Sequence, residues 1–222
     1  MKAQLKKDYI KLNKLAYNRA AKEFLGKIEL RKESDNKLVK RLAAYFEQDK
    51  KAKNLLELGP GSGYISKLFC ERGHMVTAIE FSKEMAKVAA HTAPSAKIIE
   101  AEFLSYDFNK QKFDVLLAIA FIHLFPEKDS RALVKKAHRL LKANGMAIFS
   151  TTLHDNTSEN FAQKHNFSST PMRFRRQFDK NTFLNMFSPT DWGIIDYFTN
   201  PDSEKIHGKT WQTVILMKKT SG

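Results

Sequence analysis

The sequence predicts an α/β fold of the doubly wound type, with a mostly parallel seven-stranded sheet, helices on both faces and an antiparallel C-terminal hairpin strand. Three observations predict this fold class. Short apolar segments alternate with amphipathic ones between residues 54 and 151, as in repeated β-α-β units. A turn with three alternating glycines follows the first apolar segment, and two strand-like segments close the chain.

Two helices are expected before the alternating region. Apolar residues at helical spacing among lysines predict one helix over residues 5–25. Ser34 or Asp35 is expected to cap a second helix, whose apolar side includes Leu38 and Leu42. We therefore expect a helical cap over residues 1–50 and a main domain over residues 51–222.

The alternating region predicts five parallel strands and the helices between them. The expected strands are 54–58, 75–79, 97–101, 113–119 and 146–151, and the expected helices are 64–72, 83–91 and 130–142. Right-handed crossovers bring the C-terminal ends of such strands to one edge of the sheet. Open α/β sheets bind their ligands at that edge, so the site is expected there.

After residue 151 the periodicity weakens. Residues 153–177 are polar and irregular, which predicts a loop. Asp179 is expected to cap a short helix over residues 180–187. The strand-like segments 192–198 and 211–218 are expected to pair as a hairpin at one edge of the sheet.

Composition limits the class of protein. The 222 residues are 42% hydrophobic and 28% charged, which is ordinary for a soluble protein. We expect no membrane span, because no apolar run approaches about 20 residues. The N-terminal segment lacks the apolar core of a signal peptide. The single cysteine, Cys70, excludes an internal disulfide, and a cytoplasmic location is the expectation.

Positive charge is concentrated near the N-terminus. The chain carries a net charge of +14, and residues 1–53 hold 16 Lys and Arg against 7 Asp and Glu, a net +9. Such a face can attract nucleic acid, anionic lipid or an acidic substrate. A solvated lysine-rich helix surface accounts for the same charge, so both interpretations stay open.

The glycine turn carries the strongest chemical signal. Gly59, Gly61 and Gly63 allow positive φ and a close approach of a ligand to the main chain. A dinucleotide-binding turn has the spacing G-x-G-x-x-G, whereas Tyr64 stands where its third glycine would be. The carboxylate of Glu57 would repel phosphates and suits a ligand with a cationic end. A nicotinamide enzyme is therefore disfavoured.

The segment Glu57–Gly63 resembles the E/D-x-G-x-G-x-G signature of class I S-adenosylmethionine-dependent methyltransferases. Residues 114–126 resemble the strand 4 signature of the small-molecule branch of that family. Residues 139–145 resemble the turn before its strand 5, with Ala-Asn where Pro-Gly is more usual. The resemblance runs from about residue 55 to residue 151. It implies S-adenosylmethionine as the cofactor.

The resemblance also implies roles for residues at the strand ends. The glycine turn would hold the methionine part of the cofactor, and Glu80 would accept both ribose hydroxyls. Phe81 would pack on the adenine, although a core aromatic is an equal alternative, and Glu102 would accept from the adenine amino group. The residues expected to bind the cofactor are Glu57, Gly59, Pro60, Gly61, Gly63, Glu80, Phe81, Glu102, Phe103, Ala118 and Ile119.

The acceptor site is less well defined by the sequence. Methyl transfer needs alignment, desolvation and sometimes a base. His123 is a candidate base, or else supports the cofactor loop. Tyr17 would cover the methyl donor, or else pack in the core. Residues 154–190 are expected to elaborate the acceptor site. The substrate-binding candidates there are Arg173, Arg176 and His154, and the guanidinium groups of Arg173, Arg175 and Arg176 suit a carboxylate or phosphate. A solvated loop is the alternative for the arginines.

Several classes are disfavoured. Enzymes that methylate exocyclic or amide nitrogens are disfavoured, because their Asn/Asp-Pro-Pro-aromatic tetrad does not follow strand 4. Cytosine C5 methyltransferases are disfavoured, because they need a cysteine after strand 4 and the only cysteine, Cys70, lies in the first helix of the sheet region. No metal site is expected, because Gly73 interrupts any helix that would bring Cys70 and His74 together.

The leading hypothesis is a methyltransferase acting on a small molecule, and an anionic acceptor is considered. The alternatives are an RNA methyltransferase that uses the basic N-terminal helices and a non-catalytic cofactor-binding subunit. The oligomeric state is left open.

Overall fold

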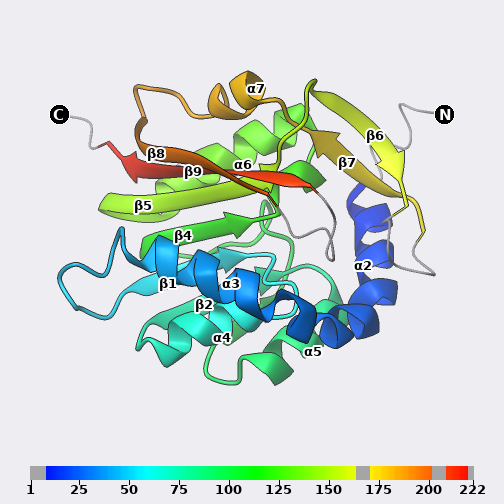
Figure 1. The fold of residues 1–222 in the computed structure, drawn as a ribbon, viewed down its shortest axis with the longest axis horizontal. Helices are drawn as coiled ribbons and strands as arrows, with labels where there is room; N and C mark the ends of the chain where they lie inside the picture. The colour runs from blue at the N-terminus through cyan, green and yellow to red at the C-terminus, as the bar shows by residue number, and fades with distance from the viewer. Residues whose placement is uncertain (1–8, 164–170, 202–208, 220–222) are drawn as a thin grey trace.

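A seven-stranded sheet forms the centre of the molecule in the computed structural model, which describes residues 9–163, 171–201 and 209–219 (Figure 1). The strand order is β3-β2-β1-β4-β5-β9-β8. The strands are β1 (Asn54–Leu58), β2 (Met75–Glu80), β3 (Lys97–Glu100), β4 (Phe113–Ile119), β5 (Leu141–Thr152), β8 (Trp192–Pro201) and β9 (Thr210–Lys218). Strand β9 runs opposite to the other six strands of this sheet, antiparallel to both β5 and β8. The predicted fold class and the C-terminal hairpin are confirmed.

The strand order reverses direction between β1 and β4. From β1 the chain winds outward through β2 to β3, and it then returns to place β4 on the other side of β1. Ligands of open α/β sheets bind at such a reversal, outside the carboxyl ends of the strands. The glycine turn follows β1 and therefore lies at this point.

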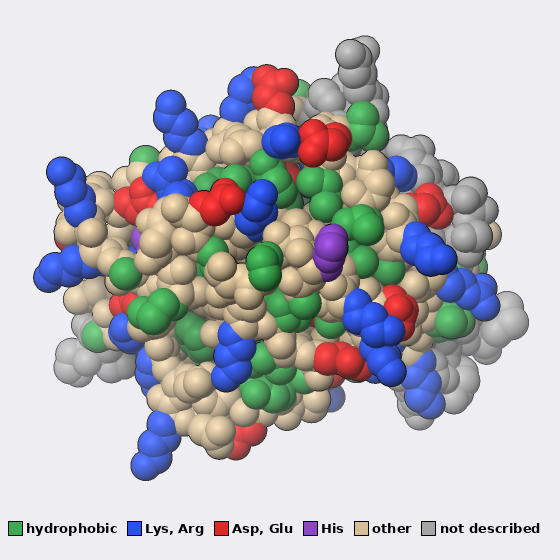
Figure 2. Space-filling model, turned by 90° about the horizontal axis from the view of Figure 1, so that it is seen from below, with side chains coloured by type: hydrophobic (Ala, Val, Ile, Leu, Met, Phe, Trp, Pro, Cys, Tyr) green, Lys and Arg blue, Asp and Glu red, His purple; other side chains and the backbone are tan. Residues whose placement is uncertain are grey.

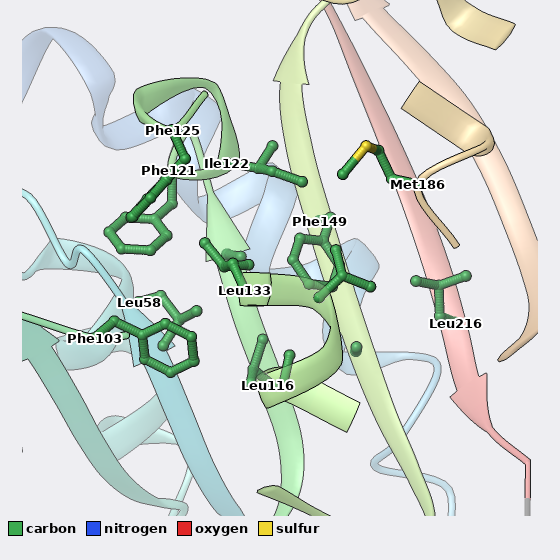
Figure 3. Packing of buried hydrophobic residues seen from close by; sticks show 14 of the residues in the cluster. Leu58, Phe103, Leu116, Phe121, Ile122, Phe125, Leu133, Phe149, Met186 and Leu216 are labelled. Carbon is green, nitrogen blue, oxygen red and sulfur yellow. The ribbon is translucent and has the colours of Figure 1, made fainter. Parts of the chain in front are cut away.

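Helices cover both faces of the sheet. Successive side chains of β1 point to opposite faces, and Leu55 packs in one core cluster while Leu56 and Leu58 pack in another. The first cluster includes side chains of α3 (Ile28–Ala43) and α4 (Tyr64–Glu71), and α5 (Lys83–Thr92) lies beside α4 (Figure 1). The second cluster includes side chains of α6 (Glu127–Leu140) and α7 (Lys180–Leu184), and Figure 3 shows part of it.

The expected cap of the second helix is wrong. Ser34 and Asp35 lie inside α3, which begins at Ile28, directly after α2 (Tyr9–Gly26). The Ser34 hydroxyl donates to the carbonyl of Arg31 at 2.9 Å, and Asp35 lies 3.6 Å from the Arg31 guanidinium. Residues 28–33 are good helix formers, so the helix extends toward the N-terminus past both polar side chains.

The predicted loop over residues 153–177 is also wrong in part. It contains the strands β6 (Ser158–Ala162) and β7 (Arg173–Gln177), which pair antiparallel in a small second sheet. Phe174 on β7 is fully buried against Tyr9 of α2, with ring centroids 5.6 Å apart. Because this packing partner lies far away in the sequence, local polarity gave no sign of a strand.

Two shorter observations complete the fold. Asp179 caps α7 as predicted and accepts from the backbone N–H of Thr182 at 2.9 Å. In the described part of the chain, none of the helices combines the length and apolar character needed to span a membrane.

Candidate functional site

The glycine turn is built so that only glycine fits at its critical positions. Gly59, Gly61 and Gly63 have φ values of 66°, 57° and 81°. A Cβ at Gly63 would lie 2.7 Å from the carbonyl oxygen of Ala89, and one at Gly59 would lie 2.6 Å from a ring carbon of Phe121. The turn therefore packs against α5 on one side and against the segment after β4 on the other.

Glu57 lies beneath this turn rather than in the open. Its side chain is 2% exposed, and its Oε2 atom accepts from the hydroxyl of Ser66 on α4. Burial raises the pKa of Glu57 to about 7, although the Ser66 hydrogen bond lowers it and the charge of Asp35 adds to the increase. A buried carboxylate under the turn makes the surroundings of the main chain more negative.

Two other acids stand at neighbouring strand ends. Glu80 ends β2, is 4% exposed and accepts from the backbone N–H of Ser82 at 2.8 Å. Burial raises the pKa of Glu80 to about 7. Glu102 follows β3, and its two oxygens accept from the N–H groups of Leu104 and Ser105 at 2.8 and 2.7 Å. Each carboxylate is thus oriented by its own turn.

A pocket lies at the C-terminal edge of the sheet, between the strand ends and α2. Most of its side chains are aromatic or aliphatic, and Glu102 is its one acidic lining residue among those described. Figure 3 shows Phe121 and Phe125 beyond the end of β4 and Phe103 beside Leu58, and the ring centroids of Phe103 and Phe121 are 6.4 Å apart. The lining residues are Tyr9, Ile10, Asn13, Ile79, Phe81, Ala101, Glu102, Phe103, Phe121, Leu124 and Phe125. Such walls suit a flat heteroaromatic ring.

Helix α2 is held over this edge by two buried or half-buried anchors near its start (Figure 1). The Tyr9 hydroxyl donates to Asp129 at 2.7 Å. The Asn13 amide donates to the Leu124 carbonyl at 3.1 Å and accepts from the Phe174 N–H at 2.7 Å. Asn13 thus joins α2, the segment after β4 and β7 in one contact.

A third anchor lies farther along α2. The Asn18 side-chain oxygen accepts from the Ser82 hydroxyl at 2.7 Å and from the Glu84 N–H at 3.2 Å. Beside it, the Tyr17 ring lies 6.1 Å from that of Phe81. Ser82 also caps α5, so α2 is fastened to the turn that carries Glu80 and Phe81.

The arginines of β7 approach the same region from the other side. The Arg173 guanidinium carbon lies 5.8 Å from the centre of the Tyr17 ring, and the side chain is 5% exposed. Arg175 donates to the Thr152 hydroxyl at 2.6 Å, and that hydroxyl lies 2.9 Å from Nε2 of His154. Burial, followed by the charge of Arg175, lowers the pKa of His154, so its ring is neutral near pH 7.

Arg176 points to the opposite face of β7. Its guanidinium lies 3.5 Å from Glu127 of α6 and 4.7 Å above the Phe178 ring. The structure therefore brings Arg173 and His154 near Tyr17 and Thr152, and places Arg176 in a separate packing contact. The sequence grouped Arg175 with Arg173 and Arg176, and its spacing of two from Arg173 places these two on one face of the strand.

His123 lies in the 3-10 turn η1 (Ile122–Leu124) that follows β4, and it is 6% exposed. Phe121 and Leu124 of this region line the pocket, whereas His123 is not among its described lining residues. Ala118 and Ile119 end β4 beside β1. Asn13, Asn18 and Thr152 carried no signal in the sequence, because each acts through partners far away in the chain.

No cluster of three or more His, Cys, Asp or Glu side chains is arranged to hold a metal ion within the described ranges.

Residues 56–149 match the family model described as a methyltransferase domain. This part of the chain is a methyltransferase domain. The family resemblance of the glycine turn is confirmed. The matched residues run from β1 to β5, and thus include the glycine turn, Glu80, Glu102 and His123.

Curated relatives match mainly this methyltransferase domain. An uncharacterized methyltransferase of Oceanobacillus iheyensis is 29% identical over 102 residues, which are 46% of this chain and 47% of the relative. A ubiquinone biosynthesis O-methyltransferase of Idiomarina loihiensis is 31% identical over 104 residues, 45% of this chain and 42% of the relative. The chain spans about half the length of these relatives.

The solved structures extend the likeness to nearly the whole fold. One is the 1,6-didemethyltoxoflavin-N1-methyltransferase of Burkholderia thailandensis, which contains 1,6-didemethyltoxoflavin and S-adenosylhomocysteine. It has a TM-score of 0.65 and 17% identity, and the match covers 91% of this chain and 88% of that one. At this identity the likeness supports the fold.

Proposed function

We propose that this protein is an S-adenosylmethionine-dependent methyltransferase that methylates a small molecule. The pocket at the C-terminal edge carries the proposal. Phe121 contacts Gly59 of the glycine turn and also lines this pocket, and α2 covers it with Tyr9 and Asn13. A site edge covered by a helix in this way suits a small ligand better than a polymer.

The chain's residues fit the cofactor. Glu80 has one oxygen oriented by Ser82 and keeps acceptor capacity for ribose hydroxyls. Phe81 and Phe103 offer apolar surfaces for adenine, and Glu102 lies among them as an acceptor for its amino group. The glycine turn, made of Gly59, Pro60, Gly61 and Gly63, would take the methionine part of the cofactor. Glu57 lies beneath the turn, and Ala118 and Ile119 end the neighbouring strand β4.

The cofactor supplies a methyl group on a positively charged sulfur, and the acceptor releases a proton as it bonds to that methyl. The chain itself has to orient the acceptor and exclude water. Tyr17 is suited to this role, because it stands between Phe81 and Arg173. We assign His123 and His154 as the candidate proton acceptors, and neutral His154 has the required protonation state.

The names of two similar proteins favour a small-molecule acceptor. One acts in ubiquinone biosynthesis as an O-methyltransferase, and the other is an N-methyltransferase of 1,6-didemethyltoxoflavin. Both names describe small molecules and not a polymer.

RNA is the second candidate acceptor, on the basis of the lysines of α2. Lys14, Arg19 and Lys22 are exposed there and directed away from the buried side of the helix. On the face in Figure 2, however, most Lys and Arg side chains stand singly, with Asp and Glu side chains among them. A phosphate backbone binds best to contiguous positive charge, so this face favours RNA less.

The proposal is tested by calorimetry with S-adenosylhomocysteine and by a labelled-methyl screen of a metabolite extract. Wild-type protein is expected to bind S-adenosylhomocysteine and to label a product of low molecular mass. Glu80→Ala is expected to weaken binding by about 10- to 100-fold, because a buried hydrogen-bond acceptor is lost. Glu84→Ala, which removes only an ion pair with Lys87 on α5, is the control and should bind normally.

Each alternative has its own outcome. Labelled RNA instead of a small product would favour the RNA methyltransferase. Binding of S-adenosylhomocysteine without turnover on either acceptor class would favour a non-catalytic subunit. If wild-type protein does not bind S-adenosylhomocysteine at all, the proposed function is wrong.

A further inference from the structure

Arg173 and Arg175 place two guanidinium groups on one face of β7. Residues two apart in a strand project to the same side, and both side chains project away from the face that buries Phe174. That shared face is turned toward Tyr17 of α2 and Thr152 at the end of β5. The two positive charges therefore lie near the end of the sheet and α2, close enough for the charge of Arg173 to act on Arg175.

Neither guanidinium has a negatively charged partner among the described residues. Arg173 is 5% exposed, and its Nε and Nη1 atoms have no hydrogen-bond acceptor in the described part of the chain. Arg175 reaches the Thr152 hydroxyl through Nη2, while its buried Nε also has no acceptor there. Burial and the nearby charge of Arg173 lower the pKa of Arg175.

Arg176 on the same strand makes the contrast clear. It is 2% exposed, and its Nε and Nη1 atoms also have no hydrogen-bond acceptor in the described part of the chain. The Glu127 carboxylate, however, lies 3.5 Å from its guanidinium, and the Phe178 ring lies 4.7 Å from its guanidinium carbon. Its charge is thus balanced within the protein. A buried cation without such a partner is costly, because the lost hydration is not replaced. The pair Arg173 and Arg175 lacks this internal compensation, so an external anion is the natural partner.

The position of the pair connects it to the proposed methyltransferase site. The Tyr17 ring lies 5.8 Å from the Arg173 guanidinium carbon, and its centre lies 6.1 Å from that of Phe81, which lines the pocket. Thr152 ends β5, the strand next to β4. An anionic group held by the arginines would thus belong to a molecule that lies beside the cofactor pocket.

We infer that Arg173 and Arg175 form a subsite for a carboxylate or phosphate group of the methyl acceptor. That the bound molecule is the methyl acceptor rests on the proposed function, whereas the anion site itself does not. Arg176, which the sequence suggested for this role, is assigned to packing. Guanidinium groups present several N–H donors in a plane and bind such anions through charge-assisted hydrogen bonds.

The test is calorimetric binding of benzoate, inorganic phosphate and uncharged benzamide, with and without S-adenosylhomocysteine. Wild-type protein is expected to bind benzoate or phosphate at least about 10-fold more tightly than benzamide, since charge-assisted hydrogen bonds are made only with the anions. Arg173→Gln and Arg175→Gln should remove this preference, and Arg173→Lys should keep part of it. The phosphate and benzoate arms distinguish the two anion classes.

Two controls separate charge at this site from charge in general. Arg19→Gln removes an exposed arginine of α2 and should leave anion binding unchanged. Arg176→Gln should lower the melting temperature but preserve the preference for benzoate or phosphate. Affinity for S-adenosylhomocysteine should stay within about twofold in the Arg173 and Arg175 variants, which shows that they are folded.

The inference is overturned if wild-type protein binds the anions no better than benzamide, or if both Gln variants retain the preference. In that case S-adenosylhomocysteine binding still stands as the measure of the proposed function. Conversely, anion binding that depends on both arginines, in a protein that does not bind S-adenosylhomocysteine, supports the subsite and rejects the methyltransferase. Should Arg173→Gln fail to fold, the Arg173→Lys and Arg175→Gln variants decide the question.

Discussion

The glycine turn and β7 occupy opposite sides of the same site, and the chain builds them in different ways. The turn lies between a strand and a helix that are adjacent in the sequence, and its shape depends on three nearby glycines. Strand β7 depends on Asn13, which lies 161 residues away from its hydrogen-bond partner Phe174. One side is thus encoded locally, and the other requires that distant segments already be packed.

The largest expected effect on stability is for a substitution in the glycine turn, which is the locally encoded side of the site. Gly63→Ala should lower the free energy of unfolding by roughly 2–5 kcal/mol, because it adds left-handed strain to overpacking against Ala89. S-adenosylhomocysteine binding should be lost with it. Gly73→Ala is the matched control, since Gly73 has a φ of 86° but nothing within 4 Å of the added Cβ. Urea denaturation of both variants measures the difference, and equal losses would contradict the packing argument.

The second prediction concerns pH and the buried carboxylate of Glu80. Its pKa is about 7 in the folded protein against an ordinary 4.5, so the folded state holds a proton that the unfolded state releases. Stability should therefore fall as pH rises between these values, by roughly 3 kcal/mol for this group, and change little above pH 7 from this cause.

Glu80→Gln should remove that part of the slope. Urea unfolding at pH 5 and pH 8 compares the variant with the wild-type protein in the absence of cofactor. Glu100→Gln, an exposed acid at the end of β3, is the control and should keep the wild-type slope. An identical slope in Glu80→Gln would show that Glu80 is ionised across the whole range.

The third prediction addresses the side that depends on distant contacts. Asn13→Ala leaves the Leu124 carbonyl and the Phe174 N–H without their partner and should cost about 2–3 kcal/mol. Because β7 carries the arginines, binding of benzoate should weaken more than binding of S-adenosylhomocysteine. Equal weakening of both ligands, measured by calorimetry, would mean that the two sides of the site are not independent.

The smallest expected effect is on the outer side of α2. Lys14→Ala and Lys22→Ala should change the free energy of unfolding by less than about 0.5 kcal/mol and leave turnover unchanged, because both side chains are exposed. A salt-dependent loss of RNA binding in a mobility-shift assay would instead show that this surface takes part in function.

Local sequence patterns were sufficient for the sheet and for one side of the site. The apolar strands, the glycine spacing and the acids at residues 57, 80 and 102 lie next to the elements that position them. By contrast, Ser34 and Asp35 were expected to cap a helix that in fact continues through them. Capping depends on where a helix starts, and the start of α3 follows from the end of α2.

The sequence by itself determined the strands and helices of the alternating region, the glycine turn and the positions of the acids, because these depend on neighbours a few residues apart. Only the tertiary structure decided that β6 and β7 are strands, that Asn13 and Asn18 fasten α2 over the site, and that Arg175 shares a face with Arg173 while Arg176 pairs with Glu127. The physical reason is that burial and charge compensation are set by groups from distant parts of the chain, which become neighbours only on folding.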